Sequence, residues 1–207
     1  MSLVFYYSPM SSATRIHWAL EEVGVPYEKV KVDLAAGDQK KPDYLALNPN
    51  GKVPLLVADG TPIFESLAIL LYLGERYGVD KGLFPTDWNE RAEALKWMCW
   101  GQATLLDAGG RIMRNTSERF PAEQRNEKAG AAAKTDMQDL LGMLDKALEG
   151  KEYLVGDHFT LADLSLSAYL PFLSRIGADI GPYKNLQGWM TRCTTRPAMA
   201  RVMTGQA

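Results

Sequence analysis

The spacing of apolar residues divides the chain into a part that mixes strands with helices and a longer part that is helical throughout. In the first part, short β-prone runs bounded by turn residues alternate with segments whose apolar residues recur every three or four positions. The expected strands are residues 3–7, 27–33, 54–58 and 63–64, and the expected helices are 12–23, a short segment ending at 48, and 65–77. The predicted order is therefore β-α-β-α-β-β-α.

Gly, Pro and Asp residues interrupt this periodicity over residues 79–88, which indicates a linker. Beyond it no segment has the alternation of a strand. Long helices are predicted over 89–114 and 122–149, each with apolar residues spaced for one buried face. The sequence thus predicts an α/β domain in residues 1–78 and an all-helical domain in residues 89–207.

Local signals locate the later helices. Thr160 is followed three positions later by Asp163, a variant of the capping box, directly before the apolar run 164–173. We therefore expect a helix to begin at Thr160. Pro197 separates two further short helical segments near the end of the sequence.

Composition and charge narrow the classes of function. The 207 residues are 46% hydrophobic and 23% charged, with a net charge of −2 and no basic stripe, so neither nucleic acid nor an anionic membrane face is an expected partner. The first residues lack the basic flank and long apolar run of a secretory signal, and no segment is apolar over the ~20 residues of a membrane span. We expect a cytoplasmic protein.

The cysteines and histidines argue against several chemistries. Cys99 and Cys193 are far apart and outside any Cys-x-x-Cys pattern, so we expect two small buried side chains rather than a disulfide or dithiol site. His17 and His158 occur without a Gly-x-Ser-x-Gly motif, which disfavours a serine hydrolase, and no His/Cys cluster indicates a metal. His17 is expected to be a partly exposed helix residue.

The first candidate site is the peptide before Pro54, which follows a turn and begins a strand. X-Pro bonds adopt the cis form at a cost of only ~0.5–1 kcal/mol. A cis bond would expose the backbone of Val53 at a sheet edge, where it could pair with a peptide-like ligand. An ordinary strand that begins with proline explains the same residues.

The second and third candidates are the beginnings of two helices. Glu65 and Ser66 follow a strand, where free backbone N–H groups suit a carboxylate and Glu65 suits an adjacent ammonium group. The serines of the turn 8–12 precede the first helix, where a hydroxyl and the helix dipole both favour a thiolate. Simple capping of the two helices is the alternative in both cases.

Four strings together resemble the cytosolic glutathione transferases. They are Ser-Pro-Met-Ser-Ser-Ala-Thr-Arg at 8–15, Leu-Asn-Pro-Asn-Gly-Lys-Val-Pro at 47–54, Phe-Glu-Ser-Leu-Ala-Ile at 64–69 and Gly-Asp-His-Phe-Thr-Leu-Ala-Asp at 156–163. The resemblance covers the whole chain. It implies an N-terminal thioredoxin-like domain, with the bond before Pro54 in cis, and an all-α C-terminal helical bundle.

The resemblance also implies roles for individual residues. Val53, before Pro54, would pair with the cysteinyl backbone of glutathione, and Glu65 and Ser66 would hold its γ-glutamyl end. Lys40 and Lys52 match positions that approach the glycyl carboxylate.

The residue that faces the thiol is less sharply indicated. Ser11 matches the activating serine of the theta, phi and zeta classes and ranks first. Ser12, where the bacterial beta class has a cysteine, ranks second, and Tyr7 ranks third.

From this resemblance we expect a glutathione transferase that activates the thiol of its co-substrate, glutathione, for attack on a small hydrophobic electrophile or a peroxide. No metal is implied. A homodimer and a role in detoxification are implied. The alternative is a glutathione-transferase fold that serves as a non-catalytic ligand carrier or protein-interaction subunit.

Overall fold

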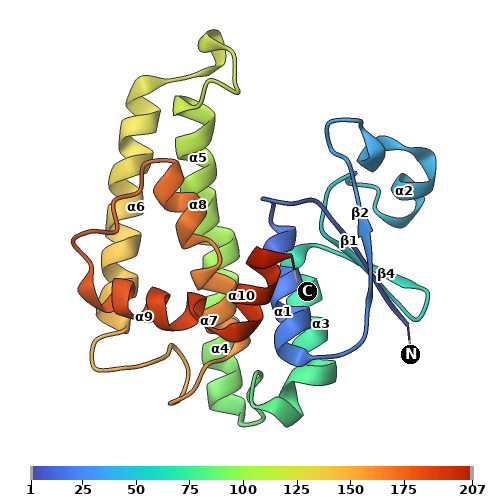
Figure 1. The fold of residues 1–207 in the computed structure, drawn as a ribbon. Coiled ribbons are helices and arrows are strands. Elements are labelled where there is room, and N and C mark those ends of the chain that lie inside the picture. Colours follow the sequence, from blue (N-terminus) through green and yellow to red (C-terminus); the bar gives the residue numbers. More distant parts are fainter. Residues whose placement is uncertain (1, 206–207) are drawn as a thin grey trace. The chain divides into compact units, whose positions relative to one another are not determined.

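The computed structural model describes residues 2–205, which form two compact units. The first unit extends to Phe84 and also includes the segment that begins at Arg196, and the second runs from Pro85 to Thr195 (Figure 1). The first unit contains the sheet, and the second is helical.

A four-stranded mixed sheet forms the centre of the first unit. Its strands are β1 (Leu3–Tyr7), β2 (Glu28–Lys31), β3 (Leu55–Ala58) and β4 (Thr61–Phe64). They lie in the order β2-β1-β3-β4, with β1 and β2 parallel and the other pairs antiparallel. The hairpin between β3 and β4 turns at Asp59 and Gly60, which both have positive φ, as a tight hairpin turn requires.

Three α-helices alternate with or follow these strands along the chain: α1 (Ala13–Val23), α2 (Pro42–Leu47) and α3 (Ser66–Leu73). Figure 1 shows α1 and α3 next to each other on one side of the strands and α2 on the other. Phe5, Ile16, Leu55 and Leu70 are fully buried in this unit. The predicted order β-α-β-α-β-β-α and the thioredoxin-like fold are therefore confirmed.

Short helical turns connect these elements. They are η1 (Asp38–Lys40) and η3 (Val79–Lys81), both 3₁₀, and the π-helical turn η2 (Gly74–Gly78), which continues α3. The helix predicted over 65–77 is thus observed as α3 and η2 together.

The last helix, α10 (Pro197–Thr204), belongs to the first unit and contacts α1. Arg196 donates to both carboxylate oxygens of Glu22 at 2.7 and 2.8 Å, and Arg201 Nε donates to Glu21 at 2.8 Å. Because these ion pairs hold α10 against α1, the observed division differs from the predicted domain 89–207 at its C-terminal end.

The second unit consists of helices. They are α4 (Trp88–Trp100), η4 (Gly101–Leu105), α5 (Leu106–Thr116), η5 (Ala122–Gln124), α6 (Glu127–Ala147), α7 (Leu161–Ser167), α8 (Leu170–Arg175) and α9 (Lys184–Thr194). No strand follows β4 in the part of the chain that the structure describes. The predicted all-α C-terminal region is confirmed.

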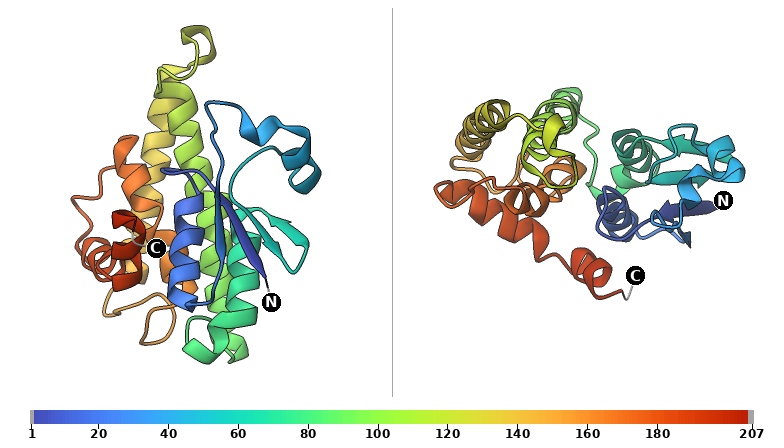
Figure 2. Two further views of the ribbon diagram at one scale, coloured as in Figure 1. Left: turned by 45° about the vertical axis from the view of Figure 1, so that its right-hand side comes forward. Right: turned by 90° about the horizontal axis from the view of Figure 1, so that it is seen from above.

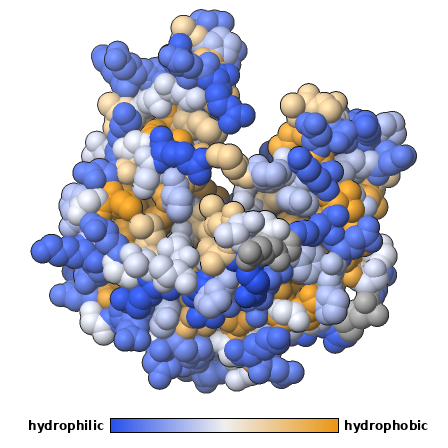
Figure 3. Space-filling model, in the orientation of Figure 1, coloured by the Kyte–Doolittle hydropathy of each residue, from blue (hydrophilic) through white to orange (hydrophobic). Residues whose placement is uncertain are grey.

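Helices α5 and α6 run side by side in opposite directions (Figures 1 and 2). Gly109 of α5 permits close packing against α8, since a Cβ there would lie 2.7 Å from the side chain of Leu173. The outer end of this helical pair, at the upper left of Figure 3, is mostly hydrophilic.

Two helix boundaries differ from the predictions for identifiable reasons. The helix predicted from residue 122 begins at Glu127, because Asn126 caps it by accepting a hydrogen bond from the backbone of Ala129. The run 164–173 is divided between α7 and α8. Pro171 has no N–H to donate to the preceding turn, so a single helix cannot pass through it.

Two side-chain expectations are also corrected. His17 is 8% exposed rather than partly exposed, because it lies among the rings of Phe5, Tyr7 and Tyr27. Cys193 is buried as expected, but Cys99 is exposed.

A buried carboxylate organises the start of α7. Asp163 is completely buried and accepts four hydrogen bonds of 2.8–3.0 Å, from the backbone N–H groups of Leu154 and Thr160, the Thr160 hydroxyl and the indole of Trp189. Burial raises its pKa, and these donors act in the opposite direction. The predicted capping box is confirmed.

We expect Asp163→Ala to lower the free energy of unfolding by about 3 kcal/mol or more, since it leaves several buried donors without an acceptor. Urea unfolding followed by circular dichroism measures the change. Asp157→Ala is the matched control, because the Asp157 side chain is fully exposed and its loss should change stability by less than about 0.5 kcal/mol. Equal effects of the two substitutions would contradict the structural role of Asp163.

Candidate functional site

The peptide bond between Val53 and Pro54 is cis, as the resemblance implied. Val53 is separated from strand β3 only by Pro54 and is half-buried. Its backbone can therefore meet an extended ligand in the manner of an added strand.

Two side chains fix the turn that leads to Val53. Asn48 Nδ2 and the Tyr44 hydroxyl each donate to the carbonyl oxygen of Lys52 at 2.7 Å, and Asn48 Oδ1 accepts from the backbone of Asn50 at 3.1 Å. Asn48 is only 2% exposed, so its polar groups are committed to this loop. Burial raises the pKa of Tyr44 to about 12, so its hydroxyl remains a donor at neutral pH.

The serine turn lies beside the same loop. Ser12 Oγ donates to the carbonyl oxygen of Val53 at 3.3 Å, and Ser12 is exposed. Ser11 Oγ instead donates to the carbonyl of Ser8 at 2.7 Å and accepts from the backbone N–H of Ala13 at 3.2 Å. The structure thus brings Ser12 to Val53, whereas the hydroxyl of Ser11 stabilises its own turn.

The third candidate, Glu65 and Ser66, opens helix α3. Glu65 has φ 66° and ψ 116°, an uncommon conformation for a residue with a side chain. Such backbone strain is found most often at functional sites. The Glu65 side chain is exposed, whereas Ser66 is 6% exposed.

Arg15, in the first turn of α1, joins this pair to the serine turn. It is 2% exposed, and its Nη2 donates to the hydroxyl of Ser66. Burial lowers the pKa of Arg15 to about 9, and the carboxylate of Glu65 acts in the opposite direction. The guanidinium therefore keeps its charge at neutral pH.

The two lysines lie at the edge of this region. Lys40 and Lys52 are exposed, and a Cβ at Gly51 would be 2.7 Å from Lys40 Nζ, so the ammonium group of Lys40 lies over the turn next to Lys52. Two cations near that turn suit a terminal carboxylate of a ligand.

The predicted site residues belong to one part of the fold. The cations at the loop, the backbone of Val53, the Ser12 hydroxyl and the start of α3 all belong to the first unit. Among the described residues there is no group of three His, Cys, Asp or Glu side chains that could hold a metal.

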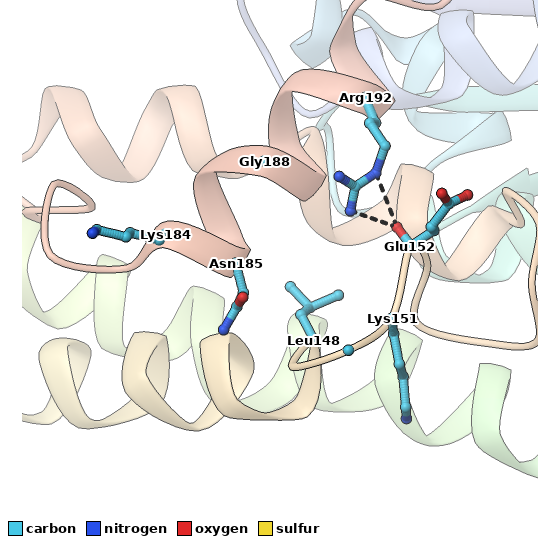
Figure 4. Close-up of a pocket in the computed structure, with 8 residues that line it drawn as sticks. Leu148, Lys151, Glu152, Lys184, Asn185, Gly188 and Arg192 are labelled. Carbon is cyan, nitrogen blue, oxygen red and sulfur yellow. Dashed lines mark hydrogen bonds between the residues drawn. The ribbon is translucent and has the colours of Figure 1, made fainter.

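The second unit has a surface hollow of about 280 Å³ that includes Lys151, Glu152, Lys184 and Arg192 (Figure 4). Arg192 donates to the backbone oxygen of Glu152 at 2.9 and 3.3 Å. The side chains of Lys151 and Lys184 point in different directions, as Figure 4 shows. These cations do not converge on one ligand position.

Sequence reasoning missed Arg15, Asn48 and Tyr44. Both Arg15 and Asn48 lie inside the strings that carried the family resemblance, but nothing in the spacing of residues shows that their side chains are buried. Each acts through a contact with a segment distant in sequence or across a turn, which only the folded chain defines.

The fold and the site define a protein that joins a thioredoxin-like unit to a helical unit. Two family models match the chain: the glutathione S-transferase N-terminal domain over residues 1–75 and the C-terminal domain over residues 102–197. The glutathione S-transferase GstB of Escherichia coli (strain K12) is 34% identical over 195 residues, which are 93% of each chain. The chain belongs to the glutathione S-transferase family, a family of enzymes whose co-substrate is glutathione.

Two further comparisons bear on the activity. The disulfide-bond oxidoreductase YfcG of Escherichia coli (strain K12) is 32% identical over 209 residues, which cover 98% of this chain and 92% of the relative. The crystal structure of a glutathione transferase homologue from Sulfitobacter, with bound glutathione, matches with a TM-score of 0.85 and 29% identity. It covers 99% of this chain and 98% of that one.

No helix among the described residues combines the length and apolar character needed to cross a membrane.

We expect Asn48→Ala to raise the Kd for glutathione roughly three- to tenfold and to lower stability by about 1–2 kcal/mol, because the Lys52 carbonyl and the Asn50 N–H each lose a partner. Calorimetric titration and thermal unfolding measure the two effects. The exposed neighbour serves as control: Asn50→Ala should change stability by less than about 0.5 kcal/mol. Unchanged glutathione binding in Asn48→Ala would show that the loop geometry does not matter for the ligand.

Proposed function

We propose that this protein binds glutathione along the Val53 backbone and activates its thiol as a thiolate, which then attacks a small electrophilic substrate. The observation that carries the proposal is the contact of Ser12 Oγ with the Val53 carbonyl at 3.3 Å. A ligand whose cysteinyl backbone pairs with Val53 would bring its sulfur close to this hydroxyl. The same site would hold the γ-glutamyl end with Glu65 and Ser66 and the glycyl carboxylate with Lys40 and Lys52.

The local groups are sufficient for thiol activation. Lowering a thiol pKa from ~8.5 to ~6.5 requires about 2.7 kcal/mol. One hydrogen bond to the charged sulfur contributes ~1.5–3 kcal/mol, and the N-terminus of α1 adds ~0.3–1 kcal/mol. No protein nucleophile is needed.

The geometry favours Ser12 over Ser11 for this role, in contrast to the ranking from the sequence. The hydroxyl of Ser11 makes a short bond of 2.7 Å within its turn, which it would have to break. Ser12 makes a longer bond of 3.3 Å and is exposed, so a thiolate could take the place of the carbonyl acceptor at lower cost.

The second substrate is an electrophilic carbon compound or a peroxide. A disulfide is a further candidate, favoured by the similarity to YfcG. The thiolate of glutathione would then attack one sulfur of the disulfide, which breaks the S–S bond, forms a mixed disulfide and releases the other sulfur as a thiolate. Glutathione itself would have to supply that thiolate, because the serine turn contains no cysteine.

A pH titration of the ultraviolet absorbance of bound thiolate tests the proposal. We expect the bound thiol to have a pKa about 1–2 units below the free ~8.5, and this pKa to return toward ~8.5 in Ser12→Ala but not in Ser11→Ala. The two variants are matched controls for each other.

If the pKa of the bound thiol returned toward the free value only in Ser11→Ala, Ser11 would be the residue that activates the thiol. Binding without any lowering of the thiol pKa would instead support the non-catalytic carrier or interaction subunit, and absence of binding at millimolar glutathione would refute the proposed site.

The family resemblance further supports a homodimer that acts in the cytoplasm in the detoxification of small hydrophobic electrophiles. Light scattering at micromolar concentration is expected to give twice the mass of 23.0 kDa. A mass of one chain would contradict the dimer.

A further inference from the structure

Arg15 is a charged group in the candidate site to which the proposed function gives no role. Its position carries two energetic costs. The guanidinium is 2% exposed, and an unpaired charge in such an environment is strongly unfavourable. It also lies in the first turn of α1, where the helix dipole disfavours a cation.

Two contacts of Arg15 are with the residues that open α3. Its Nη2 donates to Ser66 Oγ, and its charge interacts with the carboxylate of Glu65. These contacts connect the first turn of α1 to the start of α3, across 51 positions of sequence.

The direction of the Arg15–Ser66 bond has a chemical consequence for Ser66. A guanidinium can only donate hydrogen bonds, so the Ser66 oxygen must accept. A hydroxyl has one hydrogen and two lone pairs, and with one lone pair engaged by Arg15 its hydrogen remains available for another acceptor. Ser66 is therefore prepared as a donor to an anion at the N-terminus of α3.

We propose that Arg15 is a positioning residue for the γ-glutamyl end of glutathione: it holds the Ser66 hydroxyl as a donor to the α-carboxylate of the ligand. It also keeps the carboxylate of Glu65 close to that position, where Glu65 meets the α-ammonium group. This inference rests on the proposed function, because it assumes that glutathione occupies the site.

Arg15 acts through Ser66 rather than by direct contact with the ligand. The guanidinium is buried more deeply than Ser66, at 2% against 6% exposure, and Glu65 is exposed. A bond donated by a charged group also polarises the hydroxyl that accepts it, which strengthens the bond that this hydroxyl donates in turn.

The test compares glutathione with γ-aminobutyryl-cysteinylglycine, which lacks only the α-carboxylate. Calorimetric titration gives Kd for both ligands with the wild type, Arg15→Gln, Ser66→Ala and the double variant. We expect the wild type to prefer glutathione by roughly tenfold or more, the value of a charged hydrogen bond. The preference should fall to about twofold or less in each single variant and no further in the double variant, because the two residues act as one unit.

Two further variants separate positioning from a general structural effect. Arg15→Lys keeps the charge and should restore part of the preference that Arg15→Gln loses. Arg76→Gln removes an exposed arginine of the same unit and should leave the preference unchanged. If the role of Arg15 is purely structural, its substitution raises the Kd of both ligands by the same factor and leaves the ratio of the two Kd values unchanged. That result would overturn the inference.

The remaining outcomes are also decisive. If Ser66→Ala kept the full preference for glutathione, binding of the α-carboxylate of the ligand would not depend on this hydroxyl. The inference would then be wrong even if Arg15→Gln failed to fold. Arg15→Met, whose apolar side chain suits the buried position, provides a second variant for that case. If the wild type binds glutathione without preference over the analogue, the inference fails and thiol activation stands. If it binds neither ligand, the proposed function itself fails.

Discussion

A buried cation links the starts of two helices in the candidate site. Arg15 is held in the first turn of α1 at 2% exposure, and Ser66 and Glu65 at the start of α3 are its partners. Because a pKa of about 9 keeps the guanidinium charged at neutral pH, loss of either partner would cost free energy. The serine turn precedes α1, and Glu65 and Ser66 open α3, so one bond relates the two regions where the thiol and the amino-acid end of glutathione are proposed to lie.

The second unit contains a buried ion with the opposite charge. Asp163 has no exposed surface and is surrounded by four donors from the chain before α7, from the helix cap and from α9. In both units a buried charge joins segments that are separate in sequence. Burial of apolar side chains is not directional, whereas the hydrogen bonds to a buried ion are. A buried ion therefore restricts how the segments around it can be arranged.

The fold was largely predictable from the sequence because its elements follow local rules. The alternation of strand residues, the helical spacing around Leu70 and the capping pair Thr160 and Asp163 all carry local information, and the observed elements agree with them. The predictions were wrong where a single residue overrides a periodic pattern. Pro171 divides one apolar run into two helices, and Asn126 begins α6 five residues later than the pattern indicates.

The sequence by itself determined the family and the thioredoxin-like and helical parts, and it predicted a short list of candidate site residues around Ser11, Ser12, Val53 and Ser66. These properties follow from the spacing of residues over short distances and from sequence motifs that can be recognised without knowledge of the fold. Only the tertiary structure decided that Ser12 meets Val53, that Ser11 stabilises its own turn, and that Arg15 lies buried against Ser66. Such contacts depend on where the turns before α1 and β3 and the start of α3 meet in space, and no pattern along the chain records those distances.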